Sequence, residues 1–224
     1  MQRLFFLLIL SIFTASAFAQ NFDKASESDP KAKTVLEKMR KKYEAYTTLE
    51  AEFTVVIEEP EQKAQTQKGK LLQQGEKYRL TLNDRTMVSD GKSVWLHVPK
   101  NKEVQINNVE EDAEEGLSSP QDLLKAYEWK DYVYVLTNEF EENGKLVQQI
   151  EFKPLNRSSE YSKIRLTVDK KTNDVVSIKS FGKDGSRYTL NVGKLTPNKP
   201  LPASTFTFAK SECPDCHFED LRLD

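Results

Sequence analysis

Apolar residues near the start of the sequence recur every three or four positions, which is the spacing of one face of an α-helix. Asp29 and Pro30 stand just before this stripe, as an N-cap and a first-turn proline do. The pattern therefore predicts an amphipathic helix that begins at Pro30 and whose apolar face carries Val35, Leu36, Met39, Tyr43 and Tyr46.

The spacing changes to two at Leu49. From there to Glu58, apolar residues alternate with mostly polar ones, which predicts a β-strand with one dry and one wet face. The dry face of this strand holds Leu49, Ala51, Phe53, Val55 and Ile57.

The rest of the chain has the pattern of strands joined by tight turns. Pairs such as Asn143-Gly144 and Asp184-Gly185 favour hairpins because they tolerate positive φ. We expect an α+β, mainly β protein built on one large antiparallel sheet that twists and curls. Its further strands are predicted at residues 69–74, 77–82, 86–89, 93–98, 103–106, 131–138, 146–153, 162–169, 175–181 and 187–195.

One segment interrupts the strands. Residues 110–115 are mostly acidic and predict a solvated loop, and Ser119-Pro120 then begins a short helix that carries Leu123, Leu124 and Tyr127. The two helices either cap the apolar side of the sheet completely or leave a cavity beneath a movable lid. The pattern alone is compatible with both arrangements.

Residues 1–19 have the pattern of a secretory signal peptide. Arg3 precedes an apolar run that is too short to span a bilayer, and Ala17-Phe18-Ala19 is a small-x-small cleavage pattern. Residues 20–28 are polar and predict a flexible leader. Residues 29–224 then remain as a single exported domain.

Charge and composition argue against several functions. The 33 basic and 35 acidic residues nearly cancel, so the chain has no field that would attract nucleic acid. The two histidines, His97 and His217, lie far apart in the sequence, and no nucleophile elbow or Gly-rich phosphate loop accompanies them. We expect no enzyme activity, no catalytic residues and no cofactor.

The segment from Cys213 to His217 has the spacing C-x-x-C-H. That spacing occurs in covalent haem attachment, redox dithiols, metal sites and short disulfides. Haem would need surrounding helices and a distal ligand, and zinc would need a fourth ligand for which the sequence offers no obvious source. Because exported thiols usually pair, we expect a local disulfide between Cys213 and Cys216 and no metal site, with the other uses kept as alternatives.

Several motifs, in this order along the chain, resemble the LolA family of periplasmic carriers of outer-membrane lipoproteins, in its Bacteroidota-like form. They are "LEAEFTVVIE", "QKGKLLQQ", "KYRLTL", "SDGKSVW" at residues 89–95, and the tail "FTFAKSECPDCHFEDLR" at residues 206–222. The resemblance spans nearly the whole mature chain. It implies an unclosed antiparallel β-barrel whose apolar concave face is covered by helices that act as a lid.

The resemblance also implies a function, a set of partners and a site. A protein of this kind is a periplasmic monomer that takes acylated lipoproteins from an inner-membrane lipoprotein-releasing ABC transporter and carries them toward an outer-membrane acceptor. The alternative is a non-carrier module that senses lipoproteins or peptides on the same scaffold. The expected acyl-chain cavity is lined by Tyr78, Leu80, Leu82, Phe53, Val55 and Ile57, and the expected lid carries Leu123, Leu124 and Tyr127.

The sequence departs from the family pattern at one position. Family members carry a basic residue after a G-x-L motif, where it ties the lid shut. Counted without gaps from Gly69, that position is Gly75. Lys77 or Arg79 could take the role only with a shift in strand register. The tail keeps the family pattern: Phe206 and Phe208 are expected to form a Phe-x-Phe strand, and Asp220 and Arg222 an Asp-x-Arg ending.

Overall fold

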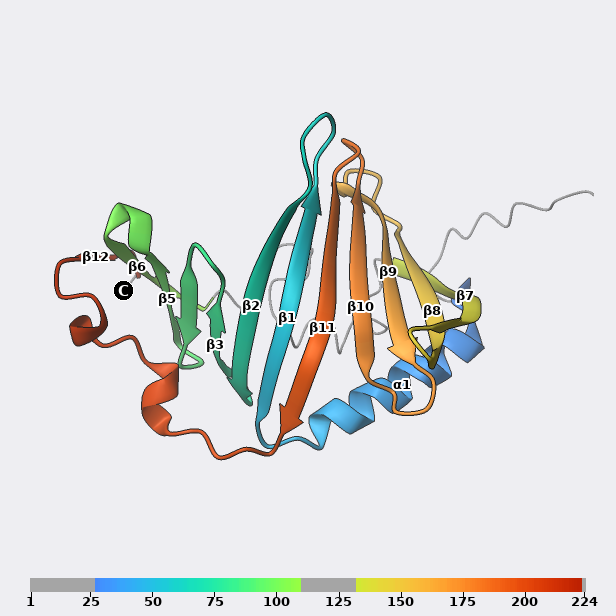
Figure 1. The fold of residues 1–224 in the computed structure, drawn as a ribbon, viewed down its shortest axis with the longest axis horizontal. Helices are drawn as coiled ribbons and strands as arrows, with labels where there is room; N and C mark the ends of the chain where they lie inside the picture. The colour runs from blue at the N-terminus through green and yellow to red at the C-terminus, as the bar shows by residue number, and fades with distance from the viewer. Residues whose placement is uncertain (1–26, 110–131, 223–224) are drawn as a thin grey trace, which may run out of the picture.

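The computed structural model describes residues 27–109 and 132–222, which form one twelve-stranded sheet and one α-helix (Figure 1). The strands lie in the order β12-β6-β5-β4-β3-β2-β1-β11-β10-β9-β8-β7. The helix is α1 (Pro30–Glu44), and the strands are β1 (Leu49–Glu58), β2 (Gln65–Gln74), β3 (Lys77–Thr81), β4 (Thr86–Ser89), β5 (Ser93–Val98), β6 (Glu103–Asn108), β7 (Tyr132–Glu142), β8 (Lys145–Pro154), β9 (Tyr161–Asp169), β10 (Val175–Gly182), β11 (Arg187–Pro197) and β12 (His217–Asp220).

The start of α1 is the one that the sequence predicts. The carboxylate of Asp29 accepts a hydrogen bond from the Lys31 amide at 2.8 Å, and Pro30 occupies the first turn, where its missing N–H costs nothing. The helix ends at Glu44, so Tyr46 lies just beyond it. The second predicted helix, at 119–127, lies outside the described residues.

The predicted hairpin turns are confirmed. Gly75, Gly91, Asn143, Gly144 and Gly185 all have positive φ, between 51° and 91°. These turns join neighbouring strands of the sheet, so the strands from β1 to β6 and from β7 to β11 run antiparallel to their neighbours.

The sheet is mainly antiparallel, as predicted, but it is mixed and not strongly curled. After β11 the chain runs back past the ends of β1, β2 and β3, through the short helices η4 (Ala203–Phe206) and η5 (Lys210–Glu212), to the far edge of the sheet (Figure 1). There β12 pairs parallel to β6. The prediction of a wholly antiparallel, strongly curled sheet is therefore wrong: the last strand, β12, adds in parallel to the edge opposite β7, and the sheet stays open.

Several strand boundaries also differ from the prediction, and one predicted strand is absent. β2 begins at Gln65, because its polar first half pairs with the second half of β1. The Phe-x-Phe strand is absent: Phe206 ends η4, and Phe208 lies in irregular chain, where both rings are buried by the sheet. The alternation of Phe206 and Phe208 thus predicted correctly that both rings are buried. It predicted wrongly that this segment is a β-strand.

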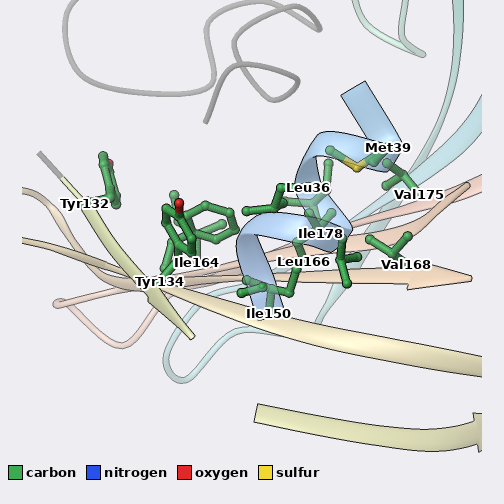
Figure 2. Close-up of a cluster of buried hydrophobic side chains, with 13 residues drawn as sticks. Leu36, Met39, Tyr132, Tyr134, Ile150, Ile164, Leu166, Val168, Val175 and Ile178 are labelled. Carbon is green, nitrogen blue, oxygen red and sulfur yellow. The ribbon is translucent and has the colours of Figure 1, made fainter. Parts of the chain in front are cut away.

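α1 packs against one face of the sheet, over β7 to β10 (Figures 1 and 2). Leu36 and Met39 from the helix are fully buried together with Ile150 and Leu166 from the strands. Burial of such side chains contributes about 1.5–3 kcal/mol each, so this cluster is the main core of the described fold.

Candidate functional site

The strand register decides on which face the predicted cavity residues lie. Residues directly opposite each other in an antiparallel pair point to the same face. One row of opposed residues runs Ala51, Leu71, Leu80, Met87 and Leu96 across five strands, from β1 to β5. The β1 and β3 residues that the sequence analysis selected therefore share one face of the sheet.

That face is the one that α1 covers further along the sheet. A second row of opposed residues runs from Val55 through Leu190, Ile178 and Leu166 to Ile150. The last three belong to the core beneath α1, and Leu190 packs against that core. The apolar surface is therefore continuous from the core under α1 to β5.

The exposure of this surface changes along the sheet. Under α1, Ile150 and Leu166 are fully buried. On β1 and β3, by contrast, Phe53, Val55 and Leu80 are half-buried. The β1–β5 part of the face therefore retains apolar area that an additional group can cover.

An open cavity of about 580 Å³ lies over β1, β2 and β11. Phe53, Leu82 and Val192 supply its apolar side chains. Gly69 makes room for the Phe53 ring, because a Cβ at Gly69 would lie 2.2 Å from Phe53 Cζ and 3.0 Å from Leu82 Cδ2. Polar and charged residues also line the cavity, and the charged ones are Glu52, Lys68, Lys70 and Lys194.

Arg79 points to the other face of the sheet. Its guanidinium donates to the carbonyl oxygens of Thr205 at 2.7 Å and Thr207 at 2.8 Å, and it pairs with Glu212 at 2.9 Å. Burial favours the neutral Glu212 carboxyl, but hydrogen bonds from Arg79 and the Ala209 amide outweigh it and hold the pKa below its usual range. Arg79 therefore fastens the C-terminal segment, and no register shift brings it to the apolar face.

A second, smaller cluster lies beneath this C-terminal segment. Val88 and Val104 from the sheet are fully buried against Phe208 and Cys216. Val88 is the register partner of Arg79, so this cluster lies on the face opposite to α1. The sheet is therefore covered on one face by α1 and on the other by the C-terminal segment.

Cys213 and Cys216 form a disulfide within this segment. The sequence analysis missed its neighbour: a ring nitrogen of His97, on β5, lies within 4.8 Å of both sulfurs. His217, which follows Cys216 in the C-x-x-C-H spacing, is instead exposed on β12. Spacing in the sequence could not indicate His97, because β5 and the tail meet only through the fold.

Leu123, Leu124 and Tyr127, the expected lid residues, lie outside the described part of the chain. Of the described helices, none is long and apolar enough to cross a membrane.

Comparison with protein families identifies the chain. The model of the family described as outer membrane lipoprotein carrier protein LolA matches residues 44–209, which is most of the sequence. This protein belongs to the LolA family. No curated protein matches the sequence closely enough to add to this assignment.

A solved structure with a TM-score above 0.5 shows the same fold at low sequence identity. An uncharacterized conserved protein from Thermus thermophilus has a TM-score of 0.56 at 10% identity, and the match covers 86% of this chain and 99% of that one. A LolA superfamily protein from Nitrosomonas europaea has a TM-score of 0.42 at 14% identity, covering 79% of this chain and 97% of that one. The fold thus occurs with very different sequences.

Proposed function

We propose that this protein is a periplasmic chaperone that binds the acyl chains of lipoproteins and carries them toward the outer membrane. The observation that carries the proposal is the continuous apolar face, which is sealed under α1 and is half-buried at Phe53, Val55 and Leu80 on β1 and β3. Membership of a family described as lipoprotein carriers supports the choice of ligand.

The physical chemistry of acyl-chain transport suits such a face. Each CH₂ group left in water costs about 0.8 kcal/mol, so a carrier needs a broad apolar surface more than it needs specific polar contacts. Phe53, Leu80 and Leu82 supply apolar side chains of different shape, and the cavity over β1 and β2 provides space beside them.

The remaining parts of the proposal follow from family membership. Cargo would arrive from an inner-membrane lipoprotein-releasing ABC transporter, and the chain would act as a monomer. Leu123, Leu124 and Tyr127 are proposed to close over the β1–β5 face as a lid. Tyr78 and Ile57 are proposed to contact the acyl chain on the same face of the sheet, outside the 580 Å³ cavity.

The direct test places a charge on the apolar face. Leu80→Glu should weaken binding of a fluorescent fatty acyl probe by about tenfold or more, because an unpaired carboxylate in a dry site is costly. Gln74→Glu is the matched control: Gln74 lies on the neighbouring strand β2, it is exposed, and its register partner Lys77 is on the face opposite to Leu80. The measurement is probe fluorescence against protein concentration, with circular dichroism to verify folding.

Two results would reject the proposal. One is a folded Leu80→Glu variant that binds the probe as well as the wild type does. The other is equal loss of binding in both variants, which would mean that charge rather than the apolar face controls binding. Mass spectrometry of lipids and lipoproteins that co-purify with the mature chain would then identify the natural cargo.

A further inference from the structure

We propose that the Cys213–Cys216 pair is a redox-controlled metal site, in which reduction frees two thiolates that bind a thiophilic cation, Zn²⁺ or Cu⁺, together with His97. The oxidised state is the disulfide that the structure shows. The site lies on the face opposite to the proposed acyl-chain surface, so this inference does not depend on the proposed function.

The first argument is geometric. A ring nitrogen of His97 and both cysteine sulfurs lie within 4.8 Å of one another. Ligand atoms around a tetrahedral zinc, about 2.0–2.3 Å from the metal, are roughly 3.3–3.8 Å apart. Breaking the disulfide lets the two sulfurs separate to that distance without moving β5 or the tail as a whole.

The second argument is an unpaired nitrogen. Among residues 27–109 and 132–222, Nε2 of His97 is the buried side-chain polar atom without a hydrogen-bond partner. A buried nitrogen without a partner normally lowers the stability of a fold by about 1–3 kcal/mol relative to a hydrogen-bonded one. We infer that Nε2 is the ring nitrogen that faces the sulfurs, so that a metal ion at the cysteines would give it the partner it lacks in the oxidised protein.

The surroundings suit a dry, well-held site. The His97 ring lies 5.0 Å from the Phe208 ring, and Val88, Val104 and Phe218 close the cluster. Glu212 and Arg79 hold the segment just before Cys213 in place. Two thiolates and one imidazole complete the coordination of trigonal Cu⁺, and they leave Zn²⁺ one position for water.

The redox step is a thiol–disulfide exchange with an external dithiol. One thiolate of that dithiol attacks a sulfur of the Cys213–Cys216 bond, and its second thiolate resolves the mixed disulfide. Two electrons and two protons pass to the protein, and the external dithiol becomes a disulfide. Cys213 is half-buried and the residues next to it, Pro214 and Asp215, are exposed, so the attacking thiol has a path to the bond.

The test uses the mature chain, reduced without oxygen and freed of reductant. Titration with Co²⁺ should show one equivalent bound, with a sulfur-to-cobalt absorption band that Zn²⁺ abolishes. Competition with a coloured Cu⁺ chelator measures the copper affinity in a separate experiment, and the two results identify the preferred cation. The oxidised chain should bind neither ion at the same concentrations.

Two histidine variants separate this site from the C-x-x-C-H spacing. His97→Gln should weaken metal binding more than about tenfold, since even loss of an outer-shell partner commonly costs 10–100-fold. His217→Gln is the matched control and should bind as the wild type does. Unchanged binding in His97→Gln, or loss only in His217→Gln, would overturn the proposal.

A measurement on the wild type covers the case in which His97→Gln does not fold. X-ray absorption of the zinc-loaded reduced chain should show two sulfur ligands and one imidazole. Four sulfurs from two chains, two sulfurs without imidazole, or no stoichiometric binding would each contradict the assignment.

Discussion

The two halves of the sheet are covered on opposite faces. Over β7 to β10, α1 seals one face with a large core that includes Leu36 and Leu166. Over β3 to β6, the C-terminal segment seals the other face with a small cluster around Val88 and Phe208. Both covers also make polar contacts with the sheet, through Lys42 and Asp174 at α1 and through Arg79 at the tail, and the tail in addition contains a disulfide.

This arrangement explains how one sheet combines a stable core with a half-buried apolar surface. If the C-terminal segment lay on the same face as α1, its side chains would cover the apolar row that includes Leu71 and Leu80. Because the tail takes the opposite face, the apolar row on β1 to β5 keeps area for a ligand. Four sets of variants test this division of the sheet.

The first prediction concerns the α1 cover. Leu36→Ala should lower the free energy of unfolding by about 2–5 kcal/mol, because it leaves a cavity at a fully buried position. Urea denaturation measures the change. Lys38→Ala, at an exposed position on the same helix, should change stability by less than about 0.5 kcal/mol. Similar changes in the free energy of unfolding for both variants would show that packing of α1 does not stabilise the sheet.

The second prediction concerns the tail cover. Arg79→Ala should cost about 1–3 kcal/mol, because it removes hydrogen bonds to two backbone carbonyls and to Glu212. Amide exchange in residues 205–218 should become faster than in α1. Lys77→Ala, two residues earlier on the same face, is the control. Uniform acceleration across both covers would mean that the halves do not open separately.

The third prediction concerns the disulfide. The double variant Cys213→Ser, Cys216→Ser should lose at most about 2 kcal/mol, because the bridge closes a very short loop. Acyl-probe binding should be unchanged, since the bridge lies on the face opposite to Leu80. Thermal unfolding and the fluorescence titration measure the two quantities. Loss of probe binding in a folded variant would mean that the disulfide on one face affects the acyl-chain surface on the other.

The fourth prediction concerns pH. Hydrogen bonds from Lys199 and Lys70 lower the pKa of Glu50 from 4.5 to about 2. A carboxylate whose pKa is lower in the folded state stabilises the fold above its unfolded pKa and loses this effect as the pH falls.

Glu50→Gln should therefore lower the melting temperature slightly at pH 7, and the difference should shrink between pH 4.5 and pH 2. Glu52→Gln, two residues along on the same strand, is the control. A difference that persists unchanged at pH 2 would show that the ion pairs are not its cause.

Neighbouring residues in the sequence were enough to predict the local elements. The cap at Asp29, the stripe that includes Leu36 and Met39, and the turns at Gly91 and Gly185 depend on neighbouring residues alone, and the structure has all of them. Alternation also indicated which side chains of β1 share a face, because the side-chain period of a strand is two whatever it pairs with. These signals, with the family motifs, were enough to predict a mainly β fold.

The segment that covers each face of the sheet could be identified only from the folded protein. The chain order does not show that the tail pairs with β6 in parallel, that Arg79 points away from the apolar row, or that His97 meets Cys213 and Cys216. Each of these depends on contacts between residues far apart in the sequence. Such contacts are selected by the packing of the whole sheet, because local patterns set the face of a side chain but leave its partner open.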